Sequence, residues 1–367
     1  MLYLPHKKMR NKGQERIHHN TTRSTGKTSK SFLSSVVLMG LLLVCALALV
    51  RPGAPDAMVV GTCKSCHTQD LSNCIGCHGQ NPGGTQSIIP VLNGGGNPQV
   101  LHHMVGGDLA GGNFYYVADG YNPDYSKGHN VGGISLRELP PKDVPPGFIG
   151  SVIIPGGTGP FQWDQTKQLT CAGTWGCHGD RTIADPLQSI SGAHHTDDSV
   201  IDGSTVGTSY RFLYGIKGKE HKTWEYQATA NNHNGYKGDG NYSSMETISY
   251  LCGECHGAYH LHQNLGGKTS DVWVRHPVDI SFSVVKGGYT GSEYQKYTNY
   301  SLDTPIAYIN PTGMETTVDV NSIVMCLSCH RAHASNYQSM LRWDYSKVFV
   351  GNGAQTGCLT CHADKAK

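Results

Sequence analysis

The sequence has few charged residues and no long amphipathic segment. Lys, Arg, Asp and Glu together make up 15% of its 367 residues, whereas glycine alone occurs 47 times. Its short apolar runs are interrupted by Gly, Pro, Asn or Asp, so helical periodicity does not persist outside one N-terminal hydrophobic stretch. This composition argues against a fold built on long helices and, taken alone, is close to that of a partly disordered chain.

Cysteine is almost absent outside one repeated pattern. Twelve of the 13 cysteines lie in six pairs and the last, Cys45, lies in the hydrophobic stretch, so no thiols remain for a separate disulfide framework. In five pairs, two residues separate the cysteines and a histidine follows the second one. These motifs are Cys63-Lys-Ser-Cys66-His67, Cys74-Ile-Gly-Cys77-His78, Cys252-Gly-Glu-Cys255-His256, Cys326-Leu-Ser-Cys329-His330 and Cys358-Leu-Thr-Cys361-His362.

Cys-x-x-Cys-His is the attachment motif of c-type haem. Its thiols form thioethers with the porphyrin, and its imidazole becomes the proximal ligand of the iron. Positions i, i+3 and i+4 share one face of a helical turn, so all three groups can meet one macrocycle. Zinc sites also use Cys-x-x-Cys pairs, but they do not require a histidine after every second cysteine. We therefore expect haem c.

A sixth, degenerate site is predicted at Cys171-Ala-Gly-Thr-Trp-Gly-Cys177-His178, where five residues separate the cysteines. The longer loop has to bulge out between the two sulfurs, and Gly173 and Gly176 would permit that bulge. The alternative is a Cys171–Cys177 disulfide with an unrelated His178. The sequence thus predicts six haems, with five as the minimum.

The histidines outside the motifs are numerous enough to provide a second iron ligand for each of these haems. The distal candidates are His102, His103, His129, His194, His195, His233, His276 and His333. One histidine from each doublet together with the other four would make six bis-His sites. We expect His221, His260 and His262 to face solvent or haem propionates, and Met remains an alternative ligand at one haem.

The N-terminal residues have the layout of an export signal. Residues 32–50 carry no charge and follow a basic tract, so 1–57 is predicted to be a signal peptide or an N-terminal anchor. It holds nine basic and two acidic residues, which leaves an excess of five negative charges on the rest of a chain whose formal net charge is +2. This balance argues against nucleic acid as a partner. It favours redox partner proteins or extracellular acceptors, with a membrane contact only through an uncleaved leader.

The remaining 310 residues would serve six haems, about 52 residues each, so haem would replace most of a side-chain core. We expect mostly irregular coil around a stack of haems, with short helices at the haem sites and a few short strands. Residues 58–367 would form one body, loosely divided into 58–135, 136–275 and 276–367. The expected strands are 114–117, 151–154, 280–285 and 306–309, and the expected helices are 246–255 and 322–329.

The C-terminal stretch, Cys326-Leu-Ser-Cys329-His330-Arg-Ala-His333 followed by Cys358-Leu-Thr-Cys361-His362, resembles the doubled Cys-x-x-Cys-His family. More loosely, the whole chain resembles exported multihaem cytochromes of metal-reducing bacteria, some of which polymerise into extracellular filaments. The resemblance implies a periplasmic or extracellular electron carrier, possible homopolymer formation and no enzymatic activity. The alternative is a multihaem reductase of the nitrite or hydroxylamine type, which needs an open iron position. Such enzymes often mark it with Cys-x-x-Cys-Lys, which does not occur here.

Overall fold

The computed structural model divides the chain into two units, residues 1–53 and 54–367. The structure describes part of the second unit: residues 74, 110–118, 123–135, 144–150, 152–153, 160–193, 201–221, 225, 228–240, 243–260, 276–284 and 288–367. The predicted leader lies outside these residues. Among them, no helix is both long enough and apolar enough to cross a membrane.

Regular secondary structure in the described residues is short and sparse, as expected from the sequence. The α-helices are α4 (Pro186–Ser189), α5 (Ile248–Cys255), α6 (Gly257–His260) and α7 (Cys358–Cys361). The 3-10 turns are η1 (Phe114–Tyr116), η2 (Tyr125–Lys127), η3 (Tyr210–Phe212), η4 (Phe282–Val284), η5 (Glu293–Lys296), η6 (Cys326–Ser328), η7 (Gln338–Met340), η8 (Tyr345–Lys347) and η9 (Ala363–Ala366).

A small mixed sheet joins strands from distant parts of the chain. Its order is β3 (Gly218–Lys219), β4 (Gly235–Lys237), β6 (Ala307–Tyr308), β7 (Ile323–Val324) and β5 (Ile280–Ser281). Strands β4 and β6 are parallel, and the other neighbours are antiparallel. A separate hairpin pairs β1 (Val152–Ile153) with β2 (Pro160–Phe161).

The predicted elements are confirmed in part. The helix expected at 246–255 is α5, and β1 and β6 lie inside two of the expected strands. The strand expected at 114–117 is wrong, because the Asn113 side chain accepts a hydrogen bond from Tyr115 N at 2.9 Å and closes a 3-10 turn instead. The run 280–285 leaves the strand after Ser281, and the helix expected at 322–329 is split into β7 and η6.

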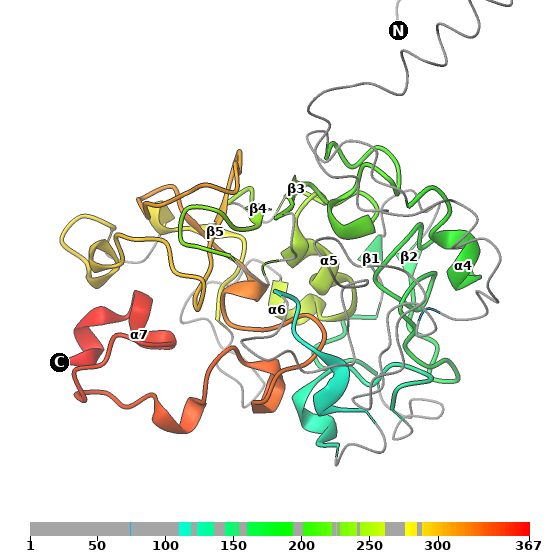
Figure 1. Cartoon of the computed structure of the whole chain (residues 1–367), viewed down its shortest axis with the longest axis horizontal. Coiled ribbons are helices and arrows are strands. Elements are labelled where there is room, and N and C mark those ends of the chain that lie inside the picture. Colours follow the sequence, from blue (N-terminus) through cyan, green and yellow to red (C-terminus); the bar gives the residue numbers. More distant parts are fainter. Residues whose placement is uncertain are drawn as a thin grey trace, which may run out of the picture. The chain divides into compact units, whose positions relative to one another are not determined.

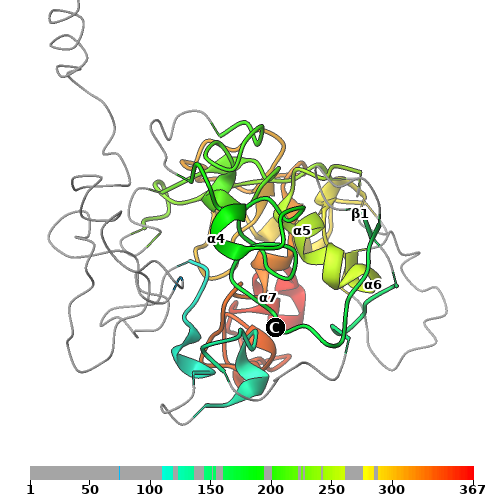
Figure 2. The ribbon, with the colours of Figure 1, turned by 90° about the vertical axis from the view of Figure 1, so that its right-hand side faces the viewer.

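Helix α5 lies at the centre of the described body, with α4 and α7 on opposite sides of it in Figure 1. It packs against α6, η6 and β1, and Figure 2 shows β1 beside α6 in the perpendicular view. The largest apolar cluster joins Ile248 and Leu251 of α5 to Ile323 of β7 and Leu327 of η6. The side-chain core therefore holds two Cys-x-x-Cys-His motifs against each other.

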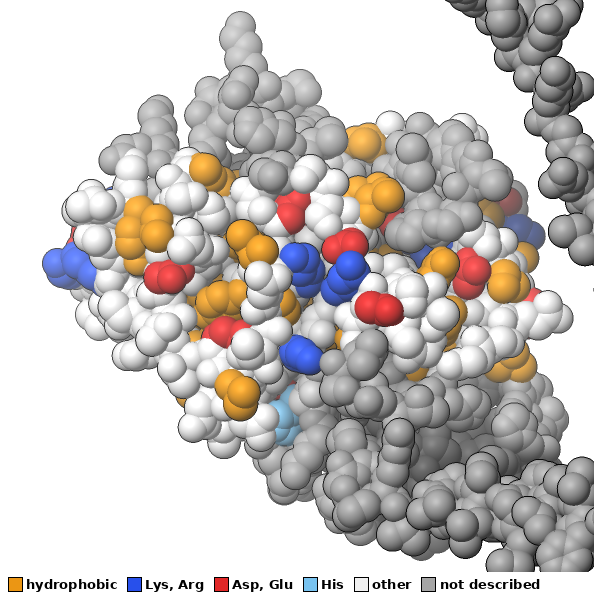
Figure 3. All heavy atoms as spheres, turned by 90° about the horizontal axis from the view of Figure 1, so that it is seen from above, with side chains coloured by type: hydrophobic (Ala, Val, Ile, Leu, Met, Phe, Trp, Pro, Cys, Tyr) orange, Lys and Arg blue, Asp and Glu red, His pale blue; other side chains and the backbone are white. Residues whose placement is uncertain are grey.

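Outside this apolar cluster, a repeated local turn fixes the irregular parts of the chain. In each case an aspartate Oδ1 accepts hydrogen bonds from both the backbone N–H and the hydroxyl of the Ser or Thr two residues later. The pairs are Asp124–Ser126, Asp164–Thr166, Asp180–Thr182, Asp202–Ser204 and Asp344–Ser346. The bonds from Ser204 lower the pKa of Asp202 to about 2. On the face shown in Figure 3, charged side chains of both signs are scattered among uncharged ones.

Candidate haem-binding sites

Each regular motif in the described residues is closed by the same backbone hydrogen bond. The N–H of His256, His330 and His362 donates to the carbonyl of the first cysteine of its own motif at 2.9, 3.0 and 3.0 Å. The cysteines lie in α5, in α7, and in η6 with Cys329 as its C-cap, and the chain leaves the helical conformation at or just before the histidine. One short turn therefore presents two thiols and an imidazole together, as the spacing predicts.

The degenerate motif is closed in the same way despite its longer loop. His178 N donates to Cys171 O at 3.0 Å, and Cys177 N donates to the same oxygen at 3.3 Å. The inserted residues bulge out between them, with Gly173 at φ +84° and Gly176 so close to Ala172 that a Cβ would lie 2.6 Å from its nitrogen. The longer loop thus closes with the same hydrogen bond as the regular motifs, and the two glycines permit its bulge.

At each described motif, two neighbouring oxygen atoms accept hydrogen bonds from the proximal histidine and from the backbone just after it. Its Nδ1 donates to the first acceptor, and a backbone N–H one or two residues further along donates to the second. The acceptors are the carbonyls of Arg211 and Phe212 for His178, of Pro146 and Gly147 for His256, and of Ser339 and Met340 for His330, with Nδ1–O distances of 2.9, 2.7 and 2.7 Å. For His362 both acceptors are the oxygens of the Glu293 carboxylate. An Nδ1 that donates in this way leaves Nε2 with the lone pair that binds a metal.

The backbone acceptors belong to tight turns. Two of the turns have consecutive residues at positive φ, Arg211 and Phe212 at +50° and +58°, and Ser339 and Met340 at +56° and +58°. This is the conformation of a type I′ turn, for which Asn and Gly are the usual residues. Sequence reasoning missed these acceptors because neither dipeptide carries that signal.

Three pairs of imidazoles face each other across the described residues. His129 lies opposite His256 with 6.1 Å between ring centres, His333 lies opposite His178 at 6.3 Å, and His276 lies opposite His362 at 6.2 Å. Each pair joins a motif histidine to one of the distal candidates. Two metal–imidazole bonds of about 2 Å in line, with the radius of each ring added, place two ring centres about 6 Å apart. The spacing therefore fits an iron between the rings.

The protonation chemistry of these rings agrees with a ligand role. Burial, with a smaller effect of the neighbouring His129, lowers the pKa of His256 to about 4. Burial also lowers the pKa values of His129, His276 and His330. The neutral imidazole is the form that coordinates metals. Together with the thiols, the site fits haem c, which would be held by two sulfurs and two imidazoles.

Thiols of successive motifs lie close to one another in chain order. The Cys74 and Cys171 thiols are near enough to shift each other's pKa, and the Cys326 thiol raises the pKa of Cys252. Burial and then the nearby Cys177 raise the pKa of Cys255, to about 11.

The same order continues to the last motif. Burial, followed by the Cys329 and Cys358 thiols, raises the pKa of Cys361 to about 12. Each of the second, degenerate, fourth and fifth motifs thus has a thiol near a thiol of the next motif, and this arrangement is the row of motifs.

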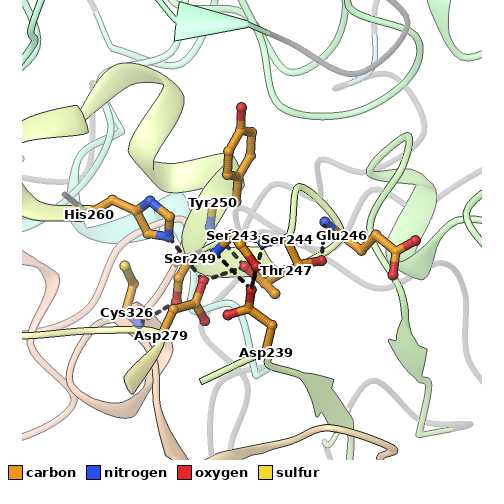
Figure 4. Close-up of polar contacts among 10 residues, drawn as sticks. All are labelled: Asp239, Ser243, Ser244, Glu246, Thr247, Ser249, Tyr250, His260, Asp279 and Cys326. Carbon is orange, nitrogen blue, oxygen red and sulfur yellow. Dashed lines mark hydrogen bonds and ion pairs between the residues drawn. The ribbon is translucent and has the colours of Figure 1, made fainter. Parts of the chain in front are cut away.

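A buried polar network ties two of these motifs together (Figure 4). The Thr247 hydroxyl donates to Asp279 Oδ2 at 2.5 Å, and His260 Nε2 lies 2.9 Å from the same oxygen. Ser249 of α5 accepts from Cys326 N at 3.1 Å. The network fixes the starts of α5 and η6 relative to the segment just before β5. It therefore fixes the motif at the end of α5 and the motif that begins in η6.

The structure does not bring every predicted ligand to a motif. His233 is 2% exposed, stacks on Tyr300 with 3.8 Å between ring centres, and directs both ring nitrogens to carbonyls, of Asn234 at 2.8 Å and Glu315 at 3.0 Å. His221 and His260 were expected to face solvent or haem propionates. The first of these alternatives is wrong, because the two residues are only 3% and 8% exposed.

Other predicted residues lack a described partner or a described position. Among the described residues, no imidazole lies opposite His330. The predicted residues that lie outside the described part of the chain are Cys63, Cys66, His67, Cys77, His78, His102, His103, His194, His195 and His262.

Comparison with known proteins identifies the class of site. Residues 320–367, well under half of the chain, match the family model of the doubled CXXCH motif. No curated protein matches the chain. Among solved structures, the outer membrane cytochrome S filament from Geobacter sulfurreducens is similar at 18% identity over 77% of each chain, with a TM-score of 0.33. A TM-score of this size establishes no shared fold.

The doubled motif alone provides two haem-attachment sites. The chain is therefore a multihaem c-type cytochrome, its cofactor is haem c, and its role is electron transfer.

Proposed function

We propose that the protein is an electron conduit of six bis-His haems that works outside the cytoplasm and does not act as an enzyme. The observation that carries the proposal is the direct packing of successive motifs: Arg181, beside the degenerate motif, pairs with Glu254 of the fourth, and Ser249 of α5 accepts from Cys326 N of the fifth. Haem c bound at these motifs supplies one-electron carriers. The chain's part is to hold successive carriers side by side and to cap each iron on both faces.

The three imidazole pairs support the distal assignments His129 to the fourth motif, His333 to the degenerate one and His276 to the last. The motifs of His67, His78 and His330 would draw ligands from the doublets His102–His103 and His194–His195. With His233 engaged elsewhere, both histidines of one doublet serve, or a neighbouring copy in a homopolymer donates one. The predicted leader supports export, to the periplasm, the cell surface or the medium.

The conduit and the enzyme differ at His330. A second imidazole makes that iron low-spin and closed, whereas an open position would suit the alternative, a multihaem reductase. The test uses protein matured in a host with a cytochrome c assembly system. We expect the denatured mass to show six covalent haems, and electron paramagnetic resonance (EPR) to show low-spin ferric haem alone.

Two results would count against the proposal. Five haem masses would remove the degenerate site. A stoichiometric high-spin signal that binds carbon monoxide after reduction would favour the reductase. Electron microscopy tests separately whether the protein forms a homopolymer. Particles that stay monomeric at high concentration would exclude one.

A further inference from the structure

The last motif differs from the other described motifs in what its histidine donates to. Three proximal histidines donate to uncharged backbone carbonyls, whereas His362 Nδ1 donates to Glu293 Oε1 at 3.1 Å. The other carboxylate oxygen accepts from Asp364 N at 3.2 Å. One side chain at the start of η5 thus occupies the position that a whole turn occupies at the other sites.

The Glu293 carboxylate is poorly solvated and forms no ion pair with a lysine or arginine among the described residues. Its side chain is 14% exposed. The nearby Lys296 and Lys367 form their ion pairs with Asp364 instead.

A carboxylate on the second nitrogen of a metal-binding histidine makes the ligand more basic than a carbonyl does. A more basic ligand and a nearby negative charge both stabilise ferric over ferrous iron, so both lower the reduction potential. Each effect acts on one site, because the other described proximal histidines have neutral acceptors.

We propose that Glu293 is a positioning residue that makes the site of Cys358, Cys361 and His362 more reducing than the three other described sites. The inference rests on the proposed function, since it assumes haem at this motif. It gives the row a direction: the C-terminal end holds electrons least strongly and delivers them toward the fifth, fourth and degenerate motifs.

The experiment is a spectroelectrochemical titration of the six-haem protein and of Glu293→Gln. We expect one component of the titration to move to more positive potential and the low-spin EPR signal of one haem to shift, with the others unchanged. Glu293→Asp keeps the charge and should move the same component in the same direction, but less far. A variant with Cys358→Ala and Cys361→Ala identifies that component, because it should be the one that disappears.

Glu315→Gln is the matched control. Its carboxylate also accepts from two backbone N–H groups, of Thr312 and Gly313, but its side chain contacts no proximal histidine among the described residues. It should leave every component in place. If the Glu293 variants retain all haems and no component moves, the inference is overturned and the conduit stands. If Glu293→Gln loses the haem of this motif, the test is made with Glu293→Asp, and the inference is again overturned if no component of its titration moves. Wild-type protein without haem would overturn the conduit itself.

Discussion

Arg181 and Glu254 form an ion pair between the degenerate motif and the fourth motif, and both side chains are buried, at 6% and 1% exposed. Glu254 lies between the two cysteines of its motif. The inserted loop of the degenerate motif holds the backbone at Arg181 in place, because the Thr174 hydroxyl donates to Arg181 O at 2.9 Å. The extra residues of that motif therefore have a structural use, which is to place a cation against the next motif.

Removing one member of this pair should cost more than removing both. Arg181→Met leaves the Glu254 charge buried without its partner, and we expect a loss of about 3–5 kcal/mol in the free energy of unfolding of the holoprotein. Arg181→Met combined with Glu254→Gln should recover most of that loss. Urea titrations followed by tryptophan fluorescence measure both. Equal losses in the single and double variants would mean that the unpaired Glu254 charge is not the cause of the loss.

His233 tests the distinction between a ligand and a structural histidine. Because both of its nitrogens bind carbonyls, His233→Asn should keep every haem low-spin and lose about 1–3 kcal/mol of stability through buried groups left unpaired. His129→Asn is the matched comparison and should produce a high-spin signal from one haem. A high-spin signal in the His233 variant would restore that residue to the ligands.

At this scale the sequence predicted the proximal residues and could not rank the distal ones. A proximal histidine is marked by its adjacency to cysteine, which is a local feature. His129 lies between Gly128 and Asn130, and His233 lies between Asn232 and Asn234, so their local sequences are similar. Only the fold distinguishes them: one lies opposite His256 and the other contacts the carbonyls of Asn234 and Glu315. Glu293, which lies far from His362 in sequence, carried no signal at all.

Among the elements, the left-handed turns under His178 and His330 are the least predictable and the most constrained. Arg-Phe and Ser-Met occupy positions where Gly or Asn would be favoured, although glycine is abundant elsewhere in the chain. The same conformation presents two successive carbonyls to the histidine and to the next N–H. The backbone strain is thus located at the candidate sites, where contacts on both sides maintain it. Helix α5 was predictable because its signals are local: an apolar run after the capping Thr247.

Ser339 allows this strain to be tested without disturbing packing, because its side chain is exposed. Ser339→Val places a β-branched residue at φ +56°, which should cost about 1–2 kcal/mol and shift the EPR signal of the haem held by His330. Ser339→Gly and Ser339→Asn tolerate that conformation and should retain both the stability and the spectrum. If all three variants behave alike, the turn does not position the histidine.

At the scale of the whole molecule, the described motifs follow one another along the row in the order of the sequence, but the distal candidates do not follow that order. His333 follows the fifth motif and faces the degenerate one, and His276 follows the fourth and faces the last. With iron bound between the rings, each such pair would join non-adjacent motifs and stabilise a chain with so little regular structure. Composition predicted the sparse secondary structure, whereas these long-range pairings depend on the fold as a whole.

The degenerate motif lies inside the row, between Cys74 on one side and Cys252 on the other, so its loss should divide the row. Cys171→Ser with Cys177→Ser should give a five-haem protein in which a pulse of less than one electron per molecule redistributes in two phases, a fast one within each fragment and a slow one between them. Cys358→Ser with Cys361→Ser also removes one haem, but from the end of the row, so redistribution should stay as fast as in the wild type. Time-resolved absorbance distinguishes the two variants. A single fast phase in both would mean that electrons bypass the degenerate motif and that the row is not the path.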